Sequence, residues 1–182
     1  MASIYLQRHT RPDIDPKICY GVSDIDLDPE FEEKHLPQVV ERLRGVEADK
    51  IYSSPLQRCR RLALKIWEMQ QDPCKEDLII DQRLLELNFG EWELTPWDDI
   101  FETEEGKAWF EDYLNATPPR GGSFKELVAA AKEFLTEVGS SDQDVIAVTH
   151  SGFIRAAMVA AGRISLEEAF SIKIEYGDLI EI

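Results

Sequence analysis

The stretch Val145–Gly152 reads VIAVTHSG, and it decides the fold class. Its first five residues are β-branched or small and apolar, which predicts a fully buried strand at Val145–Thr149. The helical pattern Gly152–Ala161 follows at once, so a strand passes directly into a helix. The same order occurs at Lys50–Ser53, which precedes the helical pattern Leu56–Met69. Strands that alternate with helices in this way indicate an α/β fold with a mostly parallel sheet.

Outward from these two units, the sequence predicts two further strands, Ser3–Gln7 and Leu78–Ile80, and two further helices, Glu33–Leu43 and Phe124–Val138. Ser123 is expected to cap the second of these helices, because Glu126 stands three residues later and completes a capping box. Near the end of the chain, Ile172–Ile174 and Leu179–Ile182 flank a Tyr-Gly-Asp turn, which predicts a closing hairpin.

Residues 92–122 do not follow the alternation of strands and helices, and they are expected to form a helical insertion. No internal repeat or low-complexity linker divides the chain. We therefore expect a single domain over residues 1–182, with three layers: a mixed, mostly parallel sheet and helices on both faces.

The chain carries 20 basic against 36 acidic residues, for a net charge of −16. Nucleic acids and anionic membrane surfaces both bind proteins with surplus positive charge, so neither is expected as a partner. No apolar segment approaches the roughly 20 residues that span a bilayer. Cys19, Cys59 and Cys74 are odd in number and lack metal-binding spacing, which is typical of reduced thiols in a cytoplasmic protein.

The negative charge is distributed unevenly along the chain. Residues 1–65 carry equal numbers of acidic and basic side chains, whereas residues 88–113 carry nine acids and one lysine. A run of acids is usually a solvated face that favours solubility. The neutral first third can therefore host a site for an anion in spite of the overall charge.

Two histidines and two arginines follow the ends of predicted strands. Arg8 and His9 come directly after the first strand, Arg58 opens the helix after the second, and His150 follows Val145–Thr149. Ligands of open α/β sheets bind beyond the carboxyl ends of the strands, where these side chains are expected to meet. Each residue alone is ordinary, because most histidines and arginines are structural or solvated. Their coincidence at one edge favours a functional site.

The chemistry of this set suits a phosphate monoester. Guanidinium groups give bidentate donors to phosphate oxygens and keep their charge, and the helix N-terminus after His150 adds backbone donors. A neutral imidazole can attack phosphorus and form a phosphohistidine that water later cleaves. The leaving alcohol needs a proton, for which Glu86 is the best candidate among many carboxylates. No cluster in the sequence has the pattern of a Mg²⁺ or Zn²⁺ site, so we expect no metal and no cofactor, and the arginines and the second histidine must neutralise the developing charge.

The motifs around these residues resemble the histidine phosphatase (phosphoglycerate mutase-like) superfamily. They are Arg8-His9-Thr10, Tyr52-Ser-Ser-Pro-Leu-Gln-Arg58-Cys59, Leu85-Glu86 with Phe89-Gly-Glu-Trp-Glu93, and Val148-Thr-His-Ser-Gly152. Their order and spacing agree with the family over nearly the whole chain. The resemblance implies that His9 is the phosphorylated nucleophile and Glu86 the proton donor, and that the phosphate pocket is completed by Arg8, Arg58 and His150. It also implies a metal-independent enzyme.

Within the superfamily the chain is most similar to alpha-ribazole phosphatases of cobalamin biosynthesis, on the runs Ile18–Asp24, Phe89–Glu93 and Trp97–Ile100. That similarity predicts hydrolysis of alpha-ribazole 5′-phosphate. The alternatives are a broad-specificity sugar or nucleotide phosphatase and a phosphoglycerate mutase-like enzyme. The run Pro118–Phe124 departs from the family's Pro-Pro-Gly-Gly-Glu-Ser-Phe: an arginine, Arg120, is gained, and Gly122 stands in place of the glutamate. Leu94 stands where a glycine often follows.

Five residues are expected to bind the substrate: Thr10, Tyr20, Gly21, Ser23 and Ser151. Residues 88–113 contain seven aromatic side chains, which either pin the insertion to the sheet or form a lid that stacks on the leaving group. A homodimer is compatible with the sequence, which does not determine the oligomeric state.

Overall fold

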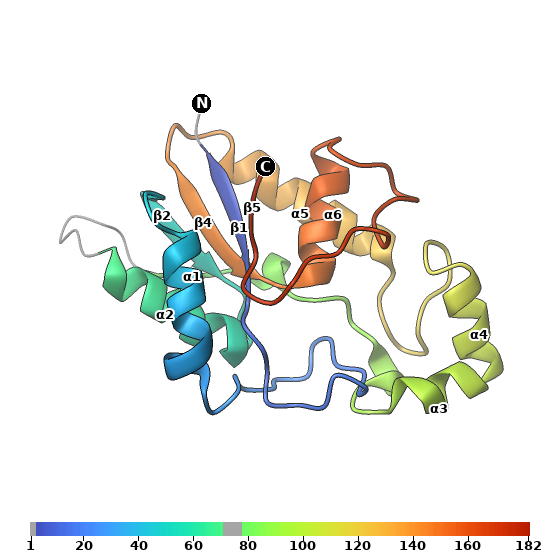
Figure 1. The fold of residues 1–182 in the computed structure, drawn as a ribbon. Helices are drawn as coiled ribbons and strands as arrows, with labels where there is room; N and C mark the ends of the chain where they lie inside the picture. The colour runs from blue at the N-terminus through green and yellow to red at the C-terminus, as the bar shows by residue number, and fades with distance from the viewer. Residues whose placement is uncertain (1–2, 71–77) are drawn as a thin grey trace.

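The computed structural model describes residues 3–70 and 78–182. Five strands form one sheet in the order β3-β2-β4-β1-β5 (Figure 1). The first four are parallel and β5 runs antiparallel to β1, which confirms the mixed, mostly parallel sheet. The strands are β1 Ile4–Arg8, β2 Lys50–Ser53, β3 Ile79–Ile80, β4 Val145–Thr149 and β5 Leu179–Glu181.

Helices cover both faces of this sheet. The α-helices are α1 Leu36–Arg42, α2 Gln57–Met69, α3 Trp97–Glu102, α4 Glu104–Glu111, α5 Phe124–Val138 and α6 Ser151–Ala160. A π-helical turn, η1 Phe31–His35, precedes α1, and two 3-10 turns lie between β3 and α3, η2 Gln82–Leu84 and η3 Gly90–Trp92. None of the helices in the described ranges is long and apolar enough to cross a membrane.

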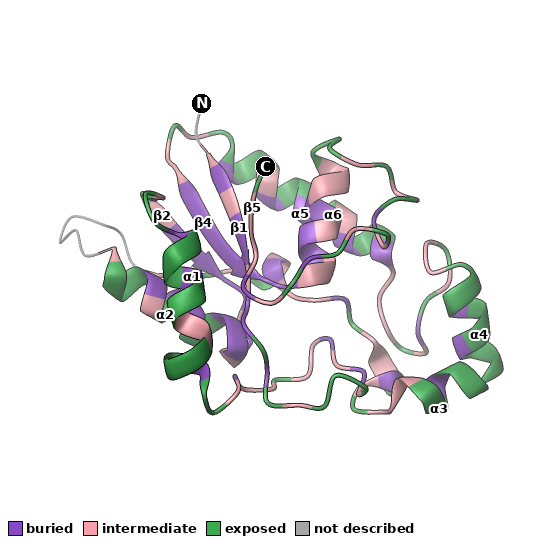
Figure 2. Cartoon of the chain, viewed as in Figure 1, coloured by how far each residue is buried: buried purple, intermediate pink, exposed green. Residues whose placement is uncertain are grey.

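The core is divided by the sheet into two clusters. On one face, Leu6 and Ala147 pack with Phe134 of α5 and Phe153 of α6. On the other face, side chains of β2 and β4 pack against α1 and α2. Every residue of β4 is buried, as a central strand covered on both faces requires (Figure 2).

The N-terminus of α5 confirms the predicted capping box. Ser123 accepts a hydrogen bond from the backbone N–H of Glu126, and the Glu126 carboxylate accepts one from the backbone N–H of Ser123. These reciprocal bonds satisfy two donors that the first turn of a helix leaves unpaired. Residues 92–122 supply α3 and α4 and no strand, and they lie to one side of the sheet (Figure 1).

The predicted closing hairpin is wrong. Leu179–Glu181 pairs with β1, and Ile172–Ile174 forms no strand. The reason lies in the hydrogen bonds of this segment, because the carbonyls of Ile172 and Ile174 accept from the side chains of Arg155 and Arg8. Those carbonyls accept hydrogen bonds from arginine side chains and not from the backbone N–H groups of a neighbouring strand.

The first helix also differs from its predicted form. The π-helical turn at Phe31–His35 precedes α1, so the element begins earlier than Glu33 and is not one regular helix. Pro37 lies in the first turn of α1 and lacks the N–H that would continue the ladder to Glu33. Cys19 and Cys59 are buried free thiols, and Cys74 lies outside the described residues.

Candidate active site

The carboxyl ends of β1, β2 and β4 bring Arg8, His9, Arg58 and His150 together. His9 follows β1, and His150 is the N-cap residue of α6, directly after β4. The two imidazole rings meet edge to face with centroids 5.1 Å apart. His9 is 2% exposed, and both Arg58 and His150 are fully buried. Three polar side chains so deeply buried need partners, or they would destabilise the fold.

The hydrogen bonding of His9 determines which ring nitrogen is free. Its Nδ1 lies 2.7 Å from the carbonyl oxygen of Thr10, and a carbonyl can only accept. Burial, followed by the positive charges of Arg58 and Arg8, holds the pKa of His9 well below its usual value. The ring is therefore neutral with the proton on Nδ1, which leaves the lone pair on Nε2.

His150 is also held neutral. Burial lowers its pKa well below the ordinary value, and the charge of Arg58 acts in the same direction. Its Nε2 lies 2.8 Å from the hydroxyl oxygen of Ser54 and 3.4 Å from the Cys59 sulfur. The backbone carbonyl of His150 accepts from the N–H of Ile154, so the residue is part of the first turn of α6.

The two guanidinium groups are held by backbone carbonyls. Arg58 donates through Nη1 to the carbonyl of Ser23 at 2.7 Å and through Nη2 to that of Gly21. Arg8 donates to the carbonyl of Ile174 and lies 4.0 Å from the ring centre of Tyr176. Each arginine also has a buried Nε–H without a partner among the described residues. Fixed cations with unused donors are chemically suited to bind an oxyanion.

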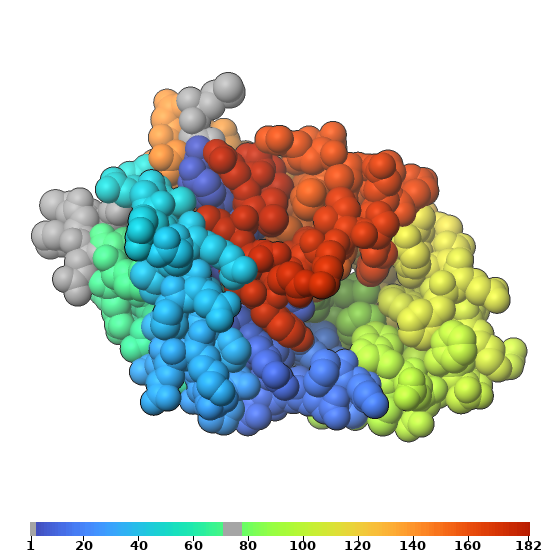
Figure 3. Space-filling view, in the orientation of Figure 1, coloured from blue at the N-terminus to red at the C-terminus, as the bar shows by residue number. Residues whose placement is uncertain are grey.

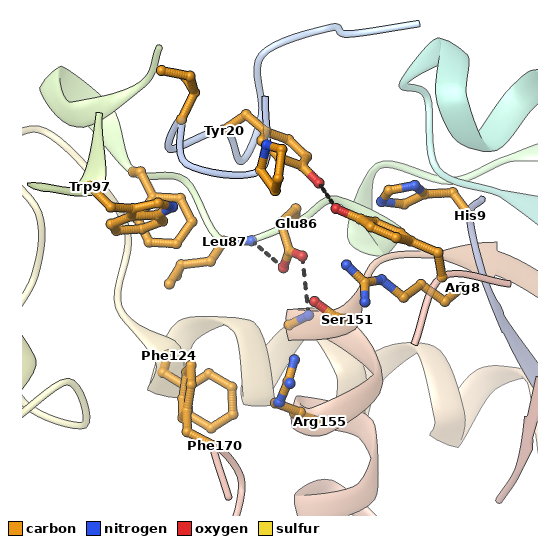
Figure 4. Close-up of a pocket in the computed structure, with 15 residues that line it drawn as sticks. Arg8, His9, Tyr20, Glu86, Leu87, Trp97, Phe124, Ser151, Arg155 and Phe170 are labelled. Carbon is orange, nitrogen blue, oxygen red and sulfur yellow. Dashed lines mark hydrogen bonds between the residues drawn. The ribbon is translucent and has the colours of Figure 1, made fainter. Parts of the chain in front are cut away.

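Glu86 lies at the N-terminus of α6. Its carboxylate accepts from the N–H of Leu87 at 2.9 Å and from the N–H of Gly152 at 3.1 Å (Figure 4). A Cβ at position 152 would lie 2.0 Å from Oε1 of Glu86, so only glycine permits this approach. The His-Ser-Gly sequence thus places a carboxylate beside the pocket as well as opening a helix.

A cavity of about 230 Å³ lies beside these groups. Arg58 and His150 are fully buried and do not line it. Of the ten residues that the sequence predicted for the site, five line the cavity: Arg8, His9, Glu86, Tyr20 and Ser151 (Figure 4). The remaining wall is largely aromatic or apolar. It comes from the loop after β1, the segment between η2 and η3, the insertion, α5, α6 and the C-terminal segment: Pro16, Ile18, Leu87, Phe89, Trp97, Phe124, Gly152, Arg155, Phe170 and Tyr176.

Three of the residues predicted to bind substrate lie behind the cavity wall. The carbonyl of Thr10 orients His9, and the carbonyls of Gly21 and Ser23 hold Arg58. A Cβ at position 21 would lie 2.0 Å from the carbonyl oxygen of Leu87. The structure therefore places these residues where they fix the side chains that face the cavity.

Glu93 organises the same loop, and the sequence reasoning assigned it no task. Its carboxylate accepts hydrogen bonds from the backbone N–H groups of Gly21, Val22, Ser23 and Phe89. Burial alone raises the pKa of Glu93, but these hydrogen bonds outweigh it and hold the pKa below its ordinary value. An ionised Glu93 thus keeps the loop that supports Arg58 in place.

Two cavity residues were missed for different reasons. Arg155 stands four positions after Ser151, and that spacing puts both on one face of α6, so the sequence did contain a signal. Tyr176 lies in an irregular segment near the C-terminus and carries no such signal.

The departures from the family pattern lie outside the cavity. Arg120 is exposed and pairs with Glu91 at 3.2 Å, and neither it nor Gly122 lines the wall. Leu94 adopts a left-handed backbone with φ of 65°, the conformation that a glycine would accept without strain. In residues 3–70 and 78–182, no three His, Cys, Asp or Glu side chains gather as metal ligands would.

A family model described as the histidine phosphatase superfamily (branch 1) matches residues 4–182. The chain belongs to this superfamily. The resemblance found in the sequence motifs is thereby confirmed, and the protein is a phosphatase of the histidine type. The two histidines, two arginines and one carboxylate of the site belong to the motifs that carry the resemblance.

Among its relatives, phosphoserine phosphatase 1 of Hydrogenobacter thermophilus is 28% identical over 176 residues, which cover 94% of this chain and 81% of that protein. Solved structures that share the fold of this chain include the following two. The mycobacterial glucosyl-3-phosphoglycerate phosphatase has a TM-score of 0.84 at 22% identity, over 99% of this chain and 89% of the other. The alpha-ribazole phosphatase of Shigella flexneri has a TM-score of 0.83 at 20% identity, and the match covers 98% of this chain and 89% of the other.

Proposed function

We propose that this histidine phosphatase is a metal-independent phosphomonoesterase that works through a phosphohistidine at Nε2 of His9. One observation carries the proposal: a buried imidazole, neutral and with its proton on Nδ1, stands beside two guanidinium groups that have unused donors. An unprotonated ring nitrogen is a nucleophile, and the guanidinium groups are placed to balance the charge of the phosphoryl oxygens.

In the first step the lone pair of His9 Nε2 attacks phosphorus and the bond from phosphorus to the leaving oxygen breaks. The Glu86 carboxyl gives its proton to that oxygen, so the alcohol leaves neutral. In the second step water attacks phosphorus, the N–P bond breaks, and Glu86 takes the proton from the water. Arg8, Arg58 and His150 hold the phosphoryl oxygens throughout.

Alpha-ribazole 5′-phosphate is the substrate that we put first, with a place in cobalamin nucleotide-loop assembly. The cavity supports this choice because Phe89, Trp97, Phe124 and Phe170 all line it. Trp97 and Phe89 also meet edge to face at 5.2 Å, so the wall is packed. A flat heteroaromatic base can stack on such a surface, which is worth about 1 kcal/mol beyond the area buried.

A second candidate is a monoester that carries a carboxylate next to the phosphate. Arg155 favours it, because this side chain lines the cavity and makes one hydrogen bond, to the carbonyl of Ile172 at 3.0 Å. Its Nε–H is buried without a partner within the described part of the chain. Burial lowers the pKa of Arg155 in spite of the opposing charge of Glu86, and a carboxylate on the substrate would add a second counter-charge.

Hydrolysis of p-nitrophenyl phosphate in EDTA tests the mechanism. We expect the wild type to be active and His9→Ala to be inactive, whereas His35→Ala serves as the matched control because His35 lies outside the cavity. Denatured enzyme quenched during turnover should carry an acid-labile, base-stable phosphoryl group on His9. Activity that survives in His9→Ala would rule the mechanism out.

The identity of the substrate is tested by comparing kcat/KM for phosphate esters that differ in a single group. Alpha-ribazole 5′-phosphate is compared with phosphoserine and with phosphoethanolamine, which lacks only the carboxylate. If the first candidate holds, kcat/KM is highest for alpha-ribazole 5′-phosphate and Arg155→Gln leaves it unchanged. If the second holds, phosphoserine exceeds phosphoethanolamine by about tenfold or more, and Arg155→Gln removes that difference.

A further inference from the structure

Two tyrosines that are far apart in the sequence join their hydroxyls beside the phosphate-binding residues. The Tyr20 and Tyr176 oxygens lie 2.7 Å apart, and both rings line the cavity. Figure 4 shows the Tyr20 hydroxyl, with the hydrogen bond drawn from it, close to His9, Arg8 and Glu86. Neither tyrosine belongs to a helix or strand. The pair is called the tyrosine clasp below.

Each ring of the clasp also lies against one phosphate-binding arginine. The Cζ atom of Arg8 is 4.0 Å from the ring centre of Tyr176, and that of Arg58 is 5.3 Å from the ring centre of Tyr20. A guanidinium group over an aromatic face is attracted by the ring quadrupole, most strongly where water is excluded. The Tyr176 ring also packs beside His9, with centroids 5.7 Å apart.

The two loops that carry the clasp are each anchored elsewhere. Next to Tyr20, the backbone N–H groups of Gly21 and Ser23 donate to Glu93. Next to Tyr176, the carbonyl of Gly177 accepts from Arg42 at 2.8 Å, and the N–H of Gly177 donates to the carbonyl of His9. The space-filling view shows the C-terminal segment lying over the N-terminal residues at the middle of this face (Figure 3).

We propose that the tyrosine clasp ties these two loops together across the phosphate pocket and thereby positions the guanidinium groups of Arg8 and Arg58 for the phosphoryl group. The inference rests on the proposed function, since it takes both arginines as ligands of the phosphoryl group. Tyr20 and Tyr176 act as positioning residues through the arginines. Without the bond between the hydroxyls, each ring and its arginine can shift with its own loop.

A cycle of two phenylalanine substitutions tests this. Tyr20→Phe and Tyr176→Phe each remove one hydroxyl and keep both rings on the arginines. Because the hydroxyls act as one bond, we expect each single variant to weaken the affinity for inorganic phosphate by about fivefold to tenfold, and the double variant to be no weaker. Titration calorimetry with phosphate measures the affinity without turnover.

Enzyme kinetics on p-nitrophenyl phosphate give a second readout. Each single variant should lower kcat/KM by the factor seen in phosphate affinity, with the melting temperature within a degree or two of the wild type. In Tyr176→Ala, kcat/KM should fall about a further tenfold, because the ring over Arg8 is lost together with the hydroxyl. Tyr176→Phe keeps the ring and should therefore not show this additional loss. Tyr113→Phe is the matched control: its hydroxyl donates to the carbonyl of Glu167 outside the cavity.

Two results would overturn the clasp. In one, both single variants bind phosphate as the wild type does; in the other, the two losses multiply in the double variant, so that the hydroxyls act independently. These outcomes are separate from the fate of the proposed function, because phosphate affinity is measured without catalysis. A His9→Ala enzyme that still turned over would remove the phosphohistidine mechanism and leave the clasp to be judged by the binding cycle.

Discussion

The two ends of the cavity are built in different ways. The phosphate end consists of Arg8, His9, Arg58 and His150, whose backbones lie at the end of β1, in the first turn of α2 and between β4 and α6. The other end is an aromatic wall with Trp97 from the insertion and Phe170 from an irregular segment near the C-terminus. The difference suggests that the strand ends position the residues that act on the phosphoryl group, whereas less regular segments determine which leaving group is accepted.

The strongest test of this contrast is Arg58→Met at the phosphate end. The substitution keeps the apolar stem and removes a fully buried cation, so we expect kcat/KM for p-nitrophenyl phosphate to fall by about 10³-fold. All substrates should lose by the same factor, because all share the phosphoryl group. Arg61→Met on the same helix is the control, since Arg61 pairs with Asp26 at the surface and should keep wild-type activity. A loss that depends strongly on the leaving group would contradict the division.

Gly152→Ala tests the junction between the two ends. The new Cβ would lie 2.0 Å from Oε1 of Glu86 and push the carboxyl away from the leaving oxygen. We expect kcat/KM for an alkyl phosphate to fall by about 10²-fold, because an alkoxide needs a proton in order to leave.

The fall on p-nitrophenyl phosphate should be smaller, since nitrophenolate leaves without a proton. Glu86→Gln should reproduce this dependence on the leaving group. Gly122→Ala is the matched control, because a Cβ there meets the Glu126 carboxylate at an ordinary 3.5 Å. Equal losses on the two substrates would mean that Glu86 is not the proton donor.

Trp97→Ala probes the aromatic wall. We expect about a tenfold rise in KM for alpha-ribazole 5′-phosphate and almost none for a small alkyl phosphate, because stacking area is lost without a change at the phosphate end. Trp109 packs behind Trp97 with ring centroids 6.3 Å apart and does not line the cavity, so Trp109→Phe should leave both KM values nearly unchanged. A KM for the ribazole ester that stays constant in Trp97→Ala would remove the stacking role.

The smallest expected effect is on stability against pH. Burial, and then the charge of Arg58, lowers the pKa of both His9 and His150, so the unfolded chain binds protons more readily than the folded one. Stability should therefore fall as the pH drops below about 6.5, down to the folded-state pKa values, and should be insensitive to these groups above it. The midpoints of urea unfolding, recorded from about pH 5 to 8, measure this dependence of stability on pH.

A His9→Gln variant should show a shallower decline, because one of the two buried imidazoles no longer titrates. The matched variant is His35→Gln. His35 has no part in the cavity and lies apart from the two buried imidazoles, so the decline that those imidazoles cause should persist in this variant. An unchanged slope in His9→Gln would mean that His9 gains its proton as easily in the folded state as in the unfolded one.

The two ends of the cavity also differ in the charge of the sequence segments that supply them. Arg8, His9 and Arg58 belong to the electrically neutral first third, whereas residues 88–113 carry nine acids and one lysine. The aromatic side chains of this segment pack on one another, as Trp97, Trp109 and Phe110 do with centroids 5.2–6.3 Å apart. A net charge of −16 is thus compatible with a pocket for an anion, because the surplus acids lie outside the part of the sequence that carries Arg8 and Arg58.

Local sequence patterns determined much of this protein. The all-apolar run of β4 identified a central strand, and the capping box before α5 located a helix start to the residue. In a parallel sheet the strand ends share one edge, so the pattern also predicted that His9 and His150 would meet. These features depend on near neighbours in the chain, and a sequence displays near neighbours directly.

Only the tertiary structure decided the rest. The pairing of Tyr20 with Tyr176, the four donors on Glu93 and the carbonyls that hold Arg8 and Arg58 join irregular segments that carry no periodic pattern. The predicted hairpin failed for the same reason, because the carbonyls of Ile172 and Ile174 bind arginines that are distant in sequence. Such contacts depend on how loops pack across the finished sheet, and local propensity contains no information about that packing.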